Sequence, residues 1–64
     1  MAGEMLTAKE LQQEVFEGRV SVGWLYLQVR EGKMPCFKAG RRVLFRRSTV
    51  LAWLEEQEQV LKND

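Results

Sequence analysis

The stretch that decides the fold is VREGKMPCFKAGRRVLFR, which occupies residues 29–46. A helical pattern of apolar residues runs into it and stops at Gly32, and Pro35 follows shortly afterwards, as is typical beyond the end of a helix. From Phe37 onward the pattern changes to short alternating runs of apolar and basic residues, which are typical of strands. The stretch therefore predicts a helix that gives way to strands within a few residues.

A hairpin is predicted over residues 36–46. Two short strands, 36–39 and 42–46, lie on either side of Gly40, and glycine is common in tight hairpin turns. Because side chains alternate along a strand, each strand has two faces. We expect one face to be apolar, with Phe37, Ala39, Val43 and Phe45, and the other to be mostly cationic, with Lys38, Arg42, Leu44 and Arg46.

One helix is predicted near the start of the chain, over about residues 8–16. Thr7 and Glu10 have the spacing of a capping box, in which each side chain accepts a hydrogen bond from the other residue's backbone N–H. Gly18 follows as a residue that can end the helix in a left-handed conformation. The polar residues before Leu6 are expected to form a flexible leader.

Two further helices are predicted, one on each side of the hairpin. Ser21 can cap a helix over about residues 22–31, and Ser48 can cap a helix that follows the hairpin. The residues expected to form the buried face of that last helix are Val50, Leu51, Trp53 and Leu54, with an apolar edge continuing at Val60 and Leu61. Its acidic residues from Glu55 onward are expected to be solvated.

These elements describe an α+β, mainly helical domain. The order of two helices, a basic hairpin and a final helix is that of a small winged helix-turn-helix, in which the second helix is the recognition helix and the hairpin is the wing. We divide the chain into a flexible leader at residues 1–5, a winged helix-turn-helix domain at residues 6–56 and a polar helical tail at residues 57–64.

The formal net charge of +1 conceals an acid–base–acid order along the chain. Residues 1–18 carry −3, residues 19–47 carry +7 and residues 48–64 carry −3. A concentrated basic segment is the electrostatic footprint of a protein that binds a polyanion. Lys and Arg on a wing would release the counterions condensed on nearby phosphates, so double-stranded DNA is the expected partner.

The composition argues against an enzyme. The chain has no histidine, and Cys36 is its only cysteine, which excludes His-based catalysis, an intrachain disulfide and a clustered zinc site. A chain of 64 residues also forms too small a core to enclose a large active site. We expect no catalytic residue, no cofactor, no metal and no small-molecule substrate. Without a signal peptide or a membrane-spanning run, the expected location is the cytoplasm, on the nucleoid, with no membrane partner.

Several short motifs follow one another between residues 6 and 54. They are Leu6-Thr7-Ala8-Lys9-Glu10, Val20-Ser21, REGKMP at residues 30–35, GRR at residues 40–42 and Trp53-Leu54. With these motifs the chain resembles the excisionase-type helix-turn-helix domains, relatives of the MerR-like winged DNA-binding domains. The resemblance implies a DNA-binding protein with its recognition helix at about residues 22–31 and its wing at about residues 37–46.

The resemblance also implies a biological role. Members of this broad family include excisionases, which bend DNA and direct a recombinase toward excision, and small transcriptional regulators of phages, plasmids and other mobile genetic elements. An excisionase-like recombination directionality factor or a small regulator of a mobile element is therefore the expected function. The expected protein partners are a site-specific recombinase (integrase) or a second copy of the chain on DNA.

Candidate DNA contacts lie on both elements. Ser21, Tyr26 and Arg30 carry over from the family's recognition helix, and Gly23, Trp24 and Leu27 are added from the same helix. Lys38, Arg41 and Arg42 carry over from the wing, and Lys33 and Arg46 are added from its flanks. Arg46 or Arg47 could instead pair with carboxylates of the last helix.

Two features depart from the family pattern. Residues 14–19 make the link between the first two helices longer than usual, and the recognition helix has Trp24 and Leu27 where the family often has polar or basic residues. These apolar residues could contact thymine methyl groups or a protein partner, or Trp24 could fold over the core. The alternative function is therefore a protein-interaction module that binds a recombinase or self-associates, which includes a role like that of a phage terminase small subunit.

Overall fold

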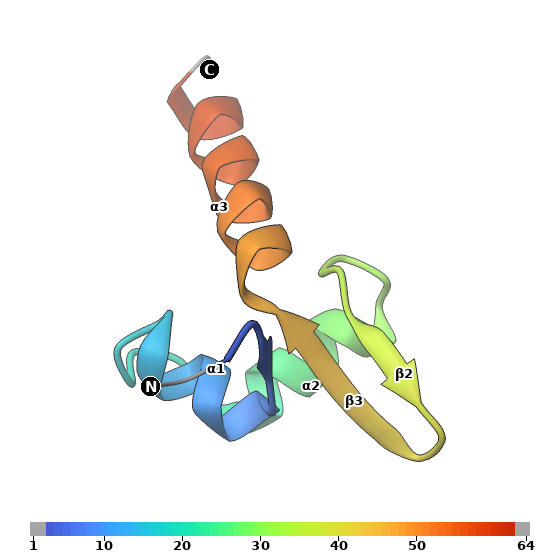
Figure 1. Ribbon diagram of the computed structural model, residues 1–64. Coiled ribbons are helices and arrows are strands. Elements are labelled where there is room, and N and C mark those ends of the chain that lie inside the picture. The colour runs from blue at the N-terminus through green and yellow to red at the C-terminus, as the bar shows by residue number, and fades with distance from the viewer. Residues whose placement is uncertain (1–2, 63–64) are drawn as a thin grey trace.

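The structure, a computed structural model, describes residues 3–62, with side chains for residues 3–58. This part of the chain contains six helices and strands. In chain order they are β1 (Met5–Leu6), α1 (Ala8–Glu14), α2 (Val22–Arg30), β2 (Phe37–Ala39), β3 (Arg42–Arg46) and α3 (Arg47–Lys62). Figure 1 shows that α1, α2 and the strands form a body from which α3 projects. The predicted α+β winged helix-turn-helix is confirmed.

The strands form an antiparallel sheet in the order β1-β3-β2, so β3 is the central strand. Leu6 pairs with Phe45, and both side chains are buried. Met5 pairs with Arg46, so the last residue of the expected leader takes part in the sheet. The division of the chain into leader, domain and tail remains a prediction.

One small core joins nearly every element. Its seven buried apolar side chains are Leu6, Ala8, Leu11, Leu25, Met34, Phe45 and Val50. Trp53 and Leu54 are half-buried and pack against this core, as predicted. Leu51 was expected with them but is 45% exposed, because it follows Val50 by about 100° around α3 and so faces away from the body.

The start of α1 is formed by the predicted capping box. The Thr7 backbone N–H donates to Glu10 Oε1 at 2.9 Å, and the Glu10 N–H donates to Thr7 Oγ1 at 3.2 Å. α1 ends at Glu14, earlier than the predicted Phe16, because the chain then turns so that Val15 and Phe16 pack against the core.

The link between α1 and α2 is held by its own hydrogen bonds. Glu17 and Gly18 both adopt positive φ, at 55° and 74°, which reverses the chain after α1. The Gly18 N–H donates to the Gln12 carbonyl at 2.8 Å, and Gln12 Nε2 donates to the Val20 carbonyl at 2.8 Å. The extra length of this link is therefore a structured turn that sets the position of α2 relative to α1.

α2 begins as predicted, with Ser21 as its N-cap. Ser21 Oγ accepts a hydrogen bond from the Trp24 N–H at 3.0 Å. The helix ends at Arg30, with Glu31 as its C-cap and Gly32 at φ 70°. Leu25 is completely buried, so α2 is anchored to the core by the middle of its inner face.

The hairpin has the predicted strands, but the predicted faces of β2 are wrong. Its register pairs Phe37 with Leu44 and Lys38 with Val43, and residues paired in this way lie on the same face. Phe37 therefore lies on the face opposite Phe45 and is 56% exposed, while Lys38 shares the face of Val43 and Phe45. The predicted strand bounds already leave a two-residue loop of Gly40 and Arg41, which gives this register, whereas the predicted faces would need a loop one residue longer.

The start of α3 also differs from the prediction. The helix begins at Arg47, so Ser48 lies inside its first turn and is not the N-cap. The Glu4 carboxylate takes that place: it accepts from the Ser48 N–H at 3.0 Å and from the Ser48 hydroxyl at 2.9 Å. The Glu4 carbonyl also accepts from the Arg47 N–H at 2.7 Å. A residue from the other end of the sequence therefore satisfies two of the free N–H groups at this helix start.

The remaining predictions about α3 concern its charges and its tail. Arg47 forms a salt bridge with Glu14 of α1 and not with a carboxylate of α3, so that predicted pairing is wrong for Arg47. The side chains from Glu55 to Glu58 are exposed, as expected. The predicted apolar edge at Val60 and Leu61 lies outside the residues whose side chains are described.

The Glu4 contacts predict a pH dependence of stability. Hydrogen bonds from the Ser48 N–H and hydroxyl, with smaller contributions from Arg46 and Arg47, hold the pKa of Glu4 below its ordinary value of 4.5. A carboxylate with a lowered pKa stabilises the fold above its unfolded pKa, and this contribution disappears as the pH falls through the folded pKa. We expect the unfolding midpoint of Glu4→Gln to depend less on pH below about 4.5 than that of the natural chain.

Thermal unfolding between pH 3 and pH 6, followed by circular dichroism, tests this expectation (roughly the range over which carboxylates titrate). Glu55→Gln is the matched control, because it makes the same change at an exposed position on α3. If the two variants showed the same pH dependence, Glu4 would have no special role in holding α3.

Candidate nucleic-acid interface

The outward surface of α2 is apolar in its middle. Leu27 lies at the centre, one turn after Gly23, with Trp24 on one side and Tyr26 and Arg30 on the other. The three large apolar side chains, Trp24, Tyr26 and Leu27, are exposed by 37%, 44% and 39%. Five of the sequence-predicted residues, Gly23, Trp24, Tyr26, Leu27 and Arg30, therefore lie on the outward surface of α2, and Ser21 precedes them as the N-cap.

Trp24 is held at the edge of this face by a contact with the link. Its ring meets that of Phe16 edge to face, with centroids 6.1 Å apart and planes at 74°. Phe16 itself packs against the core. Trp24 therefore packs partly against the fold and is partly exposed. This lies between two predicted alternatives, that Trp24 folds over the core and that it is free to contact a partner.

Gly23 is not required by the fold. Its φ is not positive, and a Cβ placed there would meet only Ser21 Oγ, at 3.8 Å. Glycine at a helical position costs up to about 1 kcal/mol relative to alanine. The effect of Gly23 is to leave the first turn of α2 without a side chain next to Leu27.

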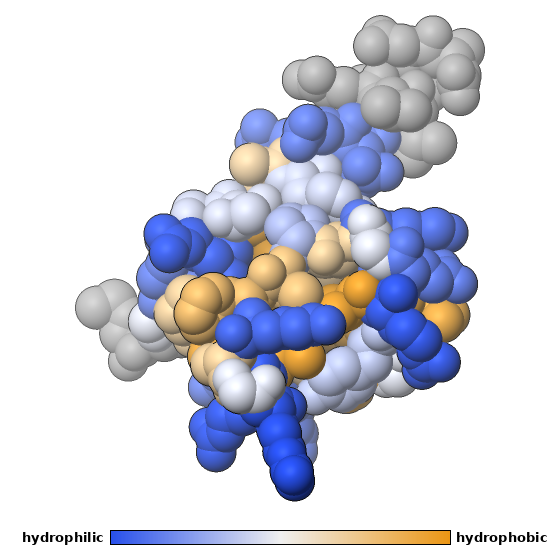
Figure 2. All heavy atoms as spheres, turned by 90° about the vertical axis from the view of Figure 1, so that its right-hand side faces the viewer, coloured by the Kyte–Doolittle hydropathy of each residue, from blue (hydrophilic) through white to orange (hydrophobic). Residues whose placement is uncertain are grey.

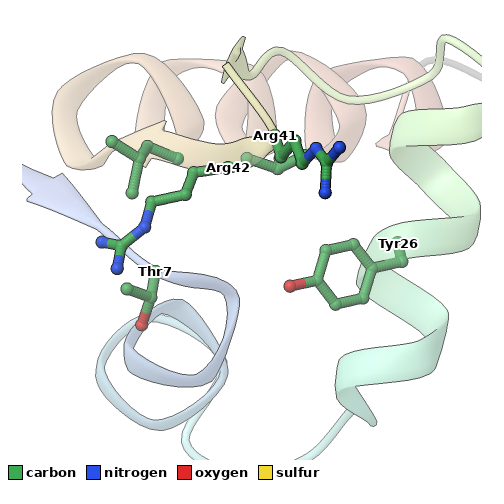
Figure 3. Close-up of a pocket in the computed structure, with 6 residues that line it drawn as sticks. Thr7, Tyr26, Arg41 and Arg42 are labelled. Carbon is green, nitrogen blue, oxygen red and sulfur yellow. The ribbon is translucent and has the colours of Figure 1, made fainter. Parts of the chain in front are cut away.

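The tip of the wing lies next to α2. A shallow pocket of about 320 Å³ is lined by Tyr26 of α2, by Arg41 and Arg42 at the hairpin loop, by Val43 and Leu44 of β3, and by Thr7. Figure 3 shows the Tyr26 hydroxyl pointing into this space, with Arg42 extending toward Thr7. The structure thus brings together one predicted residue of the recognition helix and two of the wing. Sequence reasoning assigned Thr7 only to capping and missed its place in this pocket.

The other predicted cations do not line this pocket. Lys33 forms an exposed ion pair with Glu31 at 3.3 Å and lines a second pocket, between the loop after α2 and the start of α3. Arg46 lines a third pocket with Phe37 and Thr49. Lys38 lies beside Val43 on β2, and Arg30 is exposed at the end of α2.

Most of the cations of the basic segment have no carboxylate partner among the described residues. Within residues 3–58, carboxylates pair with Lys33 and Arg47, and no ion pair is formed by Arg30, Lys38, Arg41, Arg42 or Arg46. Figure 2 shows the side of the molecule that carries the hairpin, where long hydrophilic side chains cross and surround a hydrophobic centre. This combination of apolar surface and positive charge suits a large, flat anionic partner.

Neither a metal site nor a membrane span is found in the described part of the chain. No group of three or more Cys, Asp or Glu residues lies close enough there to hold a metal ion. No described helix is both long enough and apolar enough to cross a membrane.

A family model described as a helix-turn-helix domain matches residues 18–58, which is more than half of the chain. The match begins after α1 and takes in α2, the hairpin and most of α3. No curated protein and no solved structure matches the chain.

Proposed function

The chain belongs to the excisionase-type helix-turn-helix family, and from this membership we propose that it binds double-stranded DNA with α2 in the major groove and the β2–β3 hairpin against the backbone or minor groove. Helix-turn-helix domains of this family are DNA-binding and typically non-enzymatic. The observation that carries the proposal is the shared pocket, which is lined by Tyr26 of α2 and by Arg41 and Arg42 of the wing.

Both elements have the chemistry that this placement requires. A helix fits the major groove of B-DNA, and Trp24, Tyr26 and Leu27 on the outward surface of α2 are exposed. Arg41 and Arg42 lie at the tip of a hairpin next to that surface, where the phosphates beside an occupied groove would be. The helix therefore supplies base contacts, and the wing supplies affinity that is independent of sequence.

The biological role we propose is that of an accessory factor of a mobile genetic element. An excisionase-like recombination directionality factor or a small transcriptional regulator is supported by the match to the helix-turn-helix family and by the recognition helix and wing. Its partners would be DNA, a site-specific recombinase or a second copy of itself. DNA as the partner places its action in the cytoplasm, on the nucleoid.

Binding to duplex DNA across a salt series tests the proposal. If Arg and Lys neutralise phosphates, the logarithm of the affinity falls linearly with the logarithm of the salt concentration, by about 0.9 for each phosphate contact. An affinity that did not change with salt, or no affinity for any duplex at low salt, would contradict the proposed function. Denatured protein serves as the control for non-specific adsorption of a cationic chain.

A second candidate function, self-association or binding of a partner protein, is favoured by the exposure of Trp24 and Leu27. Sedimentation of the free chain over a range of concentrations distinguishes the two functions. A monomer at all concentrations that binds DNA supports the first, and a dimer that lacks affinity for DNA supports the second.

A further inference from the structure

We infer that the apolar face of α2 reads thymine methyl groups, so that the preferred DNA carries thymines in the major groove opposite Leu27. This inference rests on the proposed function, because it assigns a class of DNA sequence to the same interface. It makes Leu27 a specificity-determining residue, whereas the wing determines affinity for any duplex.

The side chains of α2 are poorly suited to recognising base edges by hydrogen bonds. Direct readout of guanine, adenine or cytosine relies on Arg, Lys, Asn, Gln or acidic side chains. Between Val22 and Arg30 the only such residues are Gln28, which is half-buried, and Arg30, which lies in the last turn. Apart from the Tyr26 hydroxyl, the middle of the exposed face therefore has no side chain that could hydrogen-bond to those bases.

The same face is well suited to the one apolar group of the major groove. Thymine alone among the four DNA bases presents a methyl group there. Leu27 is exposed at the centre of the face, and Gly23, one turn earlier, adds no side chain that would keep a base pair away. The fold does not require glycine at position 23, and a residue without a side chain there allows close approach of an outside surface.

The charges around this face favour DNA over a protein as its occupant. Tyr26 borders both the apolar face and the pocket that holds Arg41 and Arg42, and neither arginine has a carboxylate partner within the described residues. Bound duplex DNA would present methyl groups to Leu27 and phosphates to the arginines at the same time. The neighbouring apolar and positive groups therefore favour duplex DNA over a protein as the occupant.

The test removes the methyl group alone. A preferred duplex is first selected from a random pool, and its thymines are then replaced one at a time by deoxyuridine, which keeps the pairing edge and lacks the methyl. We expect at least one replacement within the site to weaken binding about four-fold, the effect of removing one apolar carbon from a contact. Replacements outside the site are expected to have no effect.

Two variants assign the effect to Leu27. In Leu27→Ala the penalty for deoxyuridine is expected to disappear, while the salt dependence of binding is retained. Leu51→Ala is the matched control, because Leu51 is similarly exposed but lies on α3, and it should keep the full penalty. Circular dichroism confirms that both variants are folded.

The outcomes separate the inference from the proposed function. If duplex binding is salt-dependent but unaffected by any deoxyuridine, or if Leu27→Ala keeps the penalty, the inference is wrong and the proposed function stands. If no duplex binds at low salt, the proposed function itself is wrong.

Discussion

Replacing Phe45 by alanine is expected to unfold most of the protein. Phe45 is completely buried on the central strand, between β1 and β2, and large-to-small changes of this kind cost about 3–5 kcal/mol. A domain of this size has a total stability of roughly 3–10 kcal/mol, so the loss is comparable with the whole. Chemical denaturation followed by circular dichroism measures the change in the free energy of unfolding.

Phe37→Ala is the matched control for this prediction. It makes the same substitution in the same sheet, but on the outer face, where Phe37 is 56% exposed. We expect the free energy of unfolding to change by no more than about 0.5–1 kcal/mol. Comparable losses in the two variants would mean that the hairpin has a different register, with Phe37 turned toward the core.

The second large effect is expected in DNA binding. The double variant Arg41→Ala and Arg42→Ala removes both cations at the tip of the wing, next to Tyr26. If each arginine neutralises one phosphate, the affinity at about 0.1 M salt falls on the order of 50- to 100-fold, and the salt slope falls by about 1 for each phosphate that is no longer neutralised. Titration of several unrelated duplexes measures both quantities.

The decrease in affinity should be similar for all duplexes, because phosphate contacts contain no sequence information. A decrease confined to one sequence would show instead that the wing reads bases. Arg41→Lys with Arg42→Lys is the charge-matched control and should keep most of the salt slope, since lysine neutralises a phosphate as a point charge.

The parts of the fold that depend on neighbouring residues could be predicted from the sequence. The capping box of Thr7 and Glu10 and the cap at Ser21 involve residues three apart, so local spacing is enough to identify them. The strand boundaries of the hairpin were also predictable, since glycine and the alternating pattern mark them. The family resemblance, which the family match confirms, extended these local predictions to the whole fold.

Features that depend on residues distant in sequence could not be predicted. No local pattern indicates that Glu4 holds the start of α3, because its partner Ser48 is 44 residues away and is itself a good capping residue. The pairing of Arg47 with Glu14 likewise joins two helices that are far apart in the chain. The faces of β2, by contrast, follow from the predicted strand bounds: a two-residue turn of Gly40 and Arg41 pairs Phe37 with Leu44, and the predicted faces did not follow this register.

The candidate interface was predictable in its residues but only partly in its arrangement. Charge and family resemblance pointed to Tyr26, Arg41 and Arg42, and the structure places these three around one pocket. The same reasoning grouped Lys33 and Arg46 with them, although these residues line other pockets. Net charge identifies a basic segment, but the twist and register of the hairpin decide where each cation points.

The central position of β3 has a consequence for how the protein is made. The chain leaves the ribosome from its N-terminus, and residues 3–41 contain β1, α1, α2 and β2 but lack the strand that joins β1 to β2. Until Phe45 emerges, Leu6, Leu11 and Leu25 lack the largest side chain of the core they share. We therefore expect a nascent chain stalled before β3 to be sensitive to protease, and a chain released beyond α3 to become resistant in a single step.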